Sequence, residues 1–230
     1  PYGPKISATS ATVQPYACSD ATFSVTVKAE FTNGQGHNIV FEDWNANKQV
    51  IATAATDTEK EYTFSYAWEA PATHEYKIYF EGAESCANNH KPSFTSPAEP
   101  KIDNVAYAIA PVTACNVTTY DLTVTFDYVN QDGTLSVDVD GTPASSITPA
   151  FVANSTVKQS ATATFTALPA DGVARSITVK TTGGLHNCSA TKALTGVPHL
   201  PVINSVAQAY APAYACGDAQ YHVTLTVNYT

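Results

Sequence analysis

The feature that most constrains this chain is a motif that occurs three times, about 100 residues apart. Each copy starts with a proline, has an isoleucine two positions later, and reaches a cysteine 14 or 15 positions after the proline. An alternating apolar and polar run follows each cysteine. The copies lie at residues 4–18, 100–115 and 201–216, and the runs are ATFSVTVKAEF, TTYDLTVTFDY and AQYHVTLTVNY. Such a repeat predicts one structural unit written several times.

Three units are therefore expected, at residues 1–98, 99–199 and 200–230. The third stops near the end of its second strand, and a two-stranded hairpin alone is marginal in water. We expect its remainder to lie elsewhere in a longer parent protein, because the chain has no methionine and no signal peptide. The alternative is that a second molecule supplies strands to Val223, Leu225 and Val227 by β-augmentation.

The alternation of apolar and polar residues predicts an all-β fold, since successive side chains of a strand point to opposite faces. In the second unit we expect strands at residues 101–110, 119–129, 135–139, 157–167, 174–181 and about 189–195. Two Asp-Gly turns, at 132–133 and 140–141, separate short strands. This spacing predicts tandem immunoglobulin-like β-sandwiches. The proline-bearing joints at 96–101 and 196–202 predict an elongated array with fairly fixed angles.

Composition excludes some partners. The net charge is −9 and the pI is about 4.9, whereas nucleic-acid binding needs a cationic surface. No run approaches the roughly 18 apolar residues of a membrane-spanning helix. We therefore expect no nucleic-acid partner and no membrane insertion.

The cysteines predict disulfide bonds. Six alternating strands per unit would place the loop after the first strand and the loop before the last strand at the same end. The prediction is that Cys18 pairs with Cys86 and Cys115 with Cys188, while Cys216 has lost its partner by truncation. Each bond would close a loop of about 70 residues, which corresponds to about 4 kcal/mol in the chain-entropy model.

A rival pairing joins neighbouring units, Cys86 to Cys115 and Cys188 to Cys216. It ranks second because we expect the loop before the last strand to face the preceding unit. Either pairing implies an oxidising compartment outside the cytoplasm.

A family resemblance rests on the stretch TATFTALPADGVARSITVKTTGGLHNCSAT, residues 162–191, and more loosely on THEYKIYFEGAESCANN, residues 73–89. Both resemble the closing half of the PKD-like, immunoglobulin-like tandem repeats in giant surface and secreted proteins of Bacteroidota, which include gliding adhesins. The resemblance implies an exported, array-forming protein that is adhesive or structural, located at the bacterial cell surface.

Candidate sites for small ligands are few. The six histidines have no metal-site spacing, and no catalytic motif occurs, so no enzyme is expected. Asp132, Asp138 and Asp140 suggest a calcium site, although a solvated hairpin is the preferred interpretation and no cofactor is predicted.

Aromatic residues concentrate in the first unit, and Trp44 is out of phase with Ile39 and Phe41. Trp44 is therefore the candidate for stacking on a sugar ring, with core packing as the preferred interpretation. The function expected is a non-enzymatic structural or adhesive segment of a surface fibre, whose partners are neighbouring repeats. The alternatives are a carbohydrate-binding module of a secreted enzyme, with a glycan or surface ligand, and a self-associating filament subunit.

Overall fold

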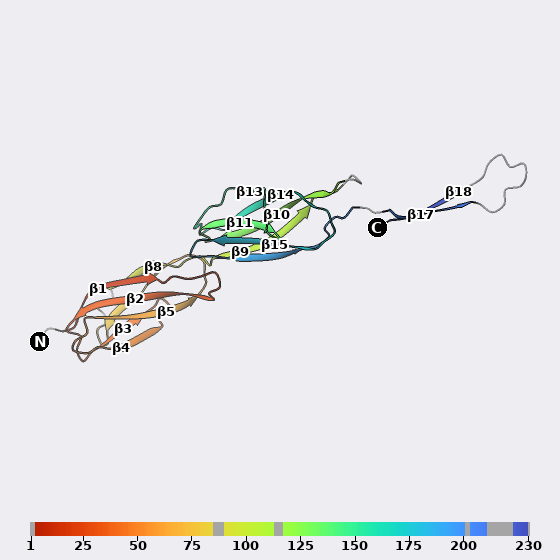
Figure 1. The fold of residues 1–230 in the computed structure, drawn as a ribbon. Helices are drawn as coiled ribbons and strands as arrows, with labels where there is room; N and C mark the ends of the chain where they lie inside the picture. Colours follow the sequence, from red (N-terminus) through yellow and green to blue (C-terminus); the bar gives the residue numbers. More distant parts are fainter. Residues whose placement is uncertain (1–2, 85–89, 113–116, 201–202, 211–222, 230) are drawn as a thin grey trace, which may run out of the picture.

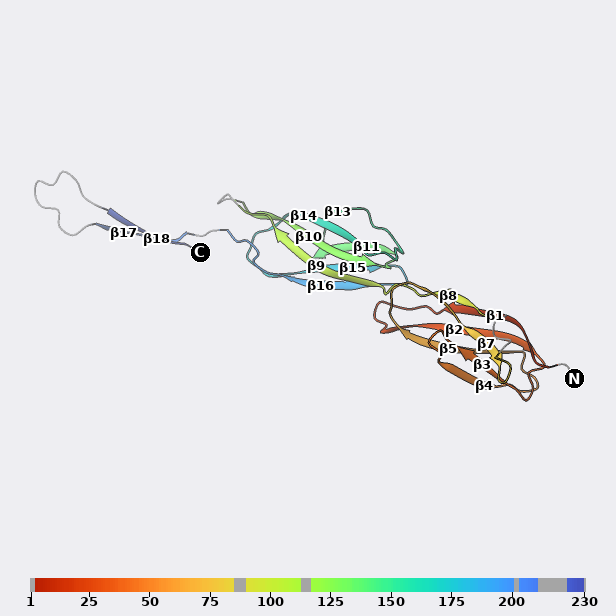
Figure 2. The same cartoon turned by 180° about the vertical axis from the view of Figure 1, so that it is seen from behind.

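The computed structural model describes residues 3–84, 90–112, 117–200, 203–210 and 223–229. Its regular elements are all β-strands, so the expected all-β class is confirmed. The described residues contain no helix long and apolar enough to cross a membrane. Two bodies with separate hydrophobic cores and a C-terminal hairpin follow one another along the molecule (Figure 1). The view from behind shows the same linear order (Figure 2).

The described residues of the N-terminal body form eight strands, in two larger sheets and a small one. The sheet orders are β1-β2-β5, β4-β3-β7 and β6-β8. The strands are β1 (Lys5–Val13), β2 (Thr22–Thr32), β3 (Asn38–Glu42), β4 (Lys48–Ala52), β5 (Glu59–Ala67), β6 (Thr73–Glu75), β7 (Lys77–Phe80) and β8 (Ser93–Thr95).

The alternation in β2 positions the core of this body. Every second side chain of β2, from Phe23 to Phe31, is at most 2% exposed. These side chains pack against Ile39 and Phe41 of β3 and Ile78 of β7. The two larger sheets therefore enclose one apolar layer, as in a β-sandwich.

The central body also consists of two sheets around a core of its own. Its two four-stranded sheets have the orders β13-β14-β10-β9 and β12-β11-β15-β16. The strands are β9 (Lys101–Ile109), β10 (Thr119–Val129), β11 (Thr134–Val139), β12 (Thr142–Pro143), β13 (Ser146–Thr148), β14 (Gln159–Pro169), β15 (Arg175–Thr182) and β16 (Ser189–Leu194). Six of them lie within two residues of the expected ranges, whereas β12 and β13 were expected to be loop.

The C-terminal hairpin consists of β17 (Ile203–Tyr210) and β18 (Val223–Tyr229). It has the register of the two hairpins that precede it, β1–β2 and β9–β10, and all three show a register shift toward the start of the first strand. Equivalent cross-strand partners are Val13 and Val25, Ile109 and Leu122, and Tyr210 and Val223. The repeat in the sequence is thus matched by a repeat in strand pairing.

Side chains of β18 that correspond to core positions elsewhere are exposed. Leu225 is 62% exposed, whereas its equivalents Val27 in β2 and Val124 in β10 are fully buried. Those two strands pair with β5 and β14 respectively. The apolar face of the hairpin is therefore open to solvent in this structure.

Candidate functional site: the junction between the bodies

A disulfide joins the two bodies. Cys18, in the loop between β1 and β2, is bonded to Cys188, which directly precedes β16. The two Cα atoms are 5.2 Å apart, and the residues are separated by 170 positions in the sequence. The expected pairs Cys18–Cys86 and Cys115–Cys188 are therefore wrong. The rival bond between Cys188 and Cys216 is wrong as well.

Three predicted cysteine positions, Cys86, Cys115 and Cys216, lie outside the described residues. The structure therefore describes one disulfide, and it connects the bodies instead of closing a loop within either of them.

The error came from the number of strand passes. β12 runs antiparallel to β11, and β13 runs antiparallel to β14. Residues 142–148 thus form one additional pass that crosses from one sheet to the other. The odd number of passes places the loop before β16 at the opposite end from the loop after β9. The loop that carries Cys188 consequently faces the N-terminal body.

Aromatic and polar contacts surround this bond. The ring of Tyr16 stacks on His186 with 4.5 Å between centroids, and Trp68 forms an edge-to-face pair with the same tyrosine, with 5.3 Å between centroids. The side-chain amide of Asn130 donates to the Tyr16 hydroxyl at 3.1 Å and to the Ala98 carbonyl at 2.6 Å. The junction therefore has side-chain contacts from both bodies and a backbone contact from the joint between them.

Gln131 supports Cys188 from inside the central body. Its side chain is fully buried, and its amide nitrogen donates to Cys188 Sγ at 2.9 Å and to the Val129 carbonyl at 3.2 Å. Its amide oxygen accepts a hydrogen bond from the Thr181 hydroxyl at 2.7 Å. A buried polar side chain with partners at both ends fixes its surroundings. Gln131 therefore positions the sulfur atom.

The loop between β15 and β16 is tied to the loop between β10 and β11. The Asp132 carboxylate accepts backbone N–H groups of Leu185 and His186, both at 2.7 Å. Burial opposes ionisation of Asp132, but these N–H donors outweigh it and hold the pKa of its carboxyl below its usual value. A Cβ on Gly184 would lie 2.8 Å from the backbone carbonyl carbon of Asp132, so a larger residue there would push the two loops apart.

The candidate calcium ligands are not brought together. Asp132 lies before β11, whereas Asp138 and Asp140 lie at its other end. Asp138 accepts the backbone N–H of Gly141, and Asp140 accepts that of Ser176. Within the described residues no group of three or more possible metal ligands occurs. The three carboxylates each accept backbone N–H groups at turns and loops.

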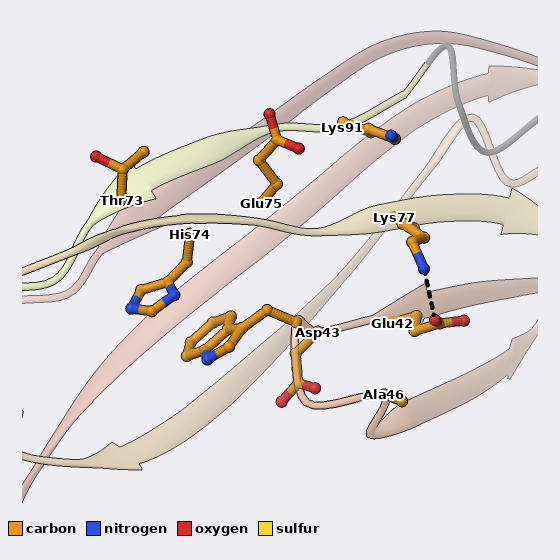
Figure 3. Close-up of a pocket in the computed structure, with 9 residues that line it drawn as sticks. Glu42, Asp43, Ala46, Thr73, His74, Glu75, Lys77 and Lys91 are labelled. Carbon is orange, nitrogen blue, oxygen red and sulfur yellow. Dashed lines mark hydrogen bonds and ion pairs between the residues drawn. The ribbon is translucent and has the colours of Figure 1, made fainter.

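A surface pocket of about 480 Å³ lies in the N-terminal body, beside Trp44. Figure 3 shows the charged side chains along its wall, with Lys77 paired to Glu42. Burial raises the pKa of Glu42, but hydrogen bonds from Tyr79, Lys77 and Lys48 outweigh it and lower the pKa overall. These charges are therefore largely satisfied by one another.

Trp44 is packed into the body and does not project from it. His74 stacks on its indole ring with 3.9 Å between centroids and 18° between planes. Tyr66 packs 4.4 Å from the same ring, and Trp44 contacts the core of the body. The face covered by His74 is closed to a sugar ring, so the geometry favours the core interpretation of Trp44.

Several junction residues were missed at the sequence level: Tyr16, Asn130, Gln131 and His186. A signal for two of them was present. Tyr-Ala-Cys at 16–18 recurs at 214–216, and asparagine occupies the same turn position at 33 and 130, with positive φ at both residues.

The fold and the junction thus define an all-β protein with two sandwich-like bodies clipped end to end by a disulfide. No protein-family model matches the chain, and no curated protein matches its sequence.

Proposed function

We propose that the chain is a non-enzymatic segment of an exported fibre, stalk or adhesin, built from tandem immunoglobulin-like sandwiches. The observation that carries this proposal is the junction, where a disulfide, a ring stack and a buried asparagine connect consecutive bodies. A chain whose specific contacts fix one unit on the next is suited to spanning a distance.

The strand plan supports the immunoglobulin-like assignment. In the central body the two sheets together provide seven strand passes, if β12 and β13 are taken as one pass that switches sheets. Seven strands in two antiparallel sheets are the immunoglobulin-like arrangement. The common hairpin register of β1–β2, β9–β10 and β17–β18 supports repetition of one unit along the chain.

The disulfide supports an oxidising location. Such bonds persist in secreted and surface proteins and are rare in the cytosol. This favours the outside of the cell, where a covalent bond between units resists both unfolding and proteolysis.

Immunogold electron microscopy tests this function. Antibodies against the 230-residue chain are applied to unpermeabilised cells that produce the protein. We expect gold particles along material outside the cell. Labelling that appears only after permeabilisation would contradict the proposal, and labelling of cells from which the coding sequence has been deleted measures the background.

A further inference from the structure

We propose that the Cys18–Cys188 bond makes the pair of bodies a nearly inextensible tie, in which tension along the chain bypasses the residues between the two cysteines. This inference rests on the proposed spanning function and adds a mechanical mechanism to it. The bond connects residues 170 positions apart, so residues 19–187 form a covalent loop. A force applied at the two chain ends passes through the bond and not around this loop.

The remaining load path consists of two strands. From the N-terminal end it follows β1 to Cys18, crosses the disulfide, and continues from Cys188 directly into β16. A β-strand already rises about 3.3 Å per residue, close to the 3.3–3.6 Å of a fully extended chain. Pulling along β1 and β16 therefore adds almost no length.

Both strands are held along their length. β1 is paired with β2 from Lys5 to Val13, and β16 is paired with β15 from Ser189 to Leu194. Antiparallel hydrogen bonds lie perpendicular to the strands, so they hold β1 and β16 laterally, while the tension runs along the backbones of these two strands and leaves the hydrogen bonds unloaded. Ile6 on β1 and Leu194 on β16 are also buried in the two cores, which opposes sliding of either strand.

The covalently closed segment, residues 19–187, lies outside the load path and contains most of the core strands of both bodies. β2, β3, β5, β10, β11, β14 and β15 all lie between the two cysteines. These strands support β1 and β16 laterally without carrying the end-to-end tension themselves. Without the bond the same tension would unravel them, and 170 residues at about 3.5 Å each correspond to about 600 Å of added length.

Single-molecule pulling of the full chain tests this mechanism. Handles are attached at the two chain ends, and extension is compared in oxidising buffer and after reduction with a phosphine. We expect reduction to add about 600 Å to the length gained on complete unfolding. Opening of the β17–β18 hairpin contributes equally in both conditions and cancels.

Two variants assign the effect to this bond. The double variant Cys18→Ser with Cys188→Ser, pulled under oxidising conditions, is expected to lengthen by several hundred ångströms more than the oxidised wild type. The matched control Cys216→Ser is expected to keep the short extension of the oxidised wild type.

An oxidised chain that lengthens as much as the reduced one would overturn the inference. A gain on reduction of less than half the expected value would also overturn it, because another bond would then define the load path. Both results are independent of the immunogold experiment, which tests location. If the protein showed this mechanical response but was located in the cytoplasm, the proposed function would be refuted and the mechanical inference would stand.

Discussion

Tyr16→Ala should weaken the junction without disturbing either core. The substitution removes two contacts that cross between the bodies, the ring stack on His186 and the hydrogen bond from Asn130. A stacked ring pair contributes about 0.5–1.5 kcal/mol, and a neutral hydrogen bond contributes about 0.5–1.5 kcal/mol. Together they correspond to about 2 kcal/mol of free energy that favours docking of the bodies.

The disulfide itself reports this free energy. Tyr16 is two residues from Cys18, so the same contacts hold the Cys18 thiol near Cys188 when the bond is reduced. A loss of about 2 kcal/mol lowers the equilibrium constant for bond formation about 30-fold, because 1.4 kcal/mol is a factor of ten. The assay is equilibration in glutathione redox buffers, followed by alkylation and mass spectrometry of the peptides that contain the two cysteines.

Two further variants sharpen the result. Tyr16→Phe keeps the stack and loses only the hydrogen bond, so we expect a shift of about fivefold, from about 1 kcal/mol. Tyr107→Ala, a half-buried tyrosine that bonds Thr195 elsewhere in the central body, is expected to leave the equilibrium unchanged. An equilibrium constant unchanged in Tyr16→Ala, or an equally large shift in Tyr107→Ala, would show that the Tyr16 contacts do not hold the bodies together.

Three other predictions concern buried or charged groups. Gln131→Ala should lower the free energy of unfolding in urea by about 2–3 kcal/mol, because it removes buried hydrogen bonds to Thr181 and Cys188 and leaves a cavity. The exposed Gln35→Ala should change it by less than about 0.5 kcal/mol, and equal effects would contradict the role of the buried amide. Asp43→Ala should cost about 2 kcal/mol, since this carboxylate accepts two backbone N–H groups in the β3–β4 turn, and hydrogen exchange in that turn should accelerate. The Lys158 ammonium is the main cause that lowers the pKa of Asp127 to about 2. In the unfolded chain the pKa of an aspartate is about 3.9. The ionised carboxylate therefore stabilises the fold above pH 4, and this stabilisation is lost as the pH falls toward 2. In Asp127→Asn the loss of stability between pH 4 and pH 2 should be smaller than in the wild type. If acid unfolding followed by circular dichroism is the same in both proteins, the Asp127–Lys158 ion pair does not contribute this stability.

Strand positions were accessible from the sequence because alternation marks the faces of a half-buried strand. β10 was expected at 119–129 and is found there, since its apolar side chains are regularly spaced and bounded by turn residues. The sequence repeat also predicts which residues of the first two units are equivalent. Phe64 pairs with Val25 in the N-terminal body as Phe165 pairs with Leu122 in the central body.

The disulfide partner was not accessible, because it depends on whether the number of strand passes is odd or even. That number is decided by residues 142–148, where Ile147 is the only large apolar side chain in two very short strands. A segment with so little alternation is predicted to be a loop. Missing this one strand pass places the loop between β15 and β16, which carries Cys188, at the wrong end of the body. The contacts of Tyr16 depend on that placement and were missed with it.

The most direct test of the junction is peptide mapping of the protein digested without reduction. We expect a linked pair of peptides, one containing Cys18 and the other Cys188, that separates on reduction. Linked pairs of Cys18 with Cys86 and of Cys115 with Cys188 would show that each unit closes on itself, and would contradict a disulfide between the bodies.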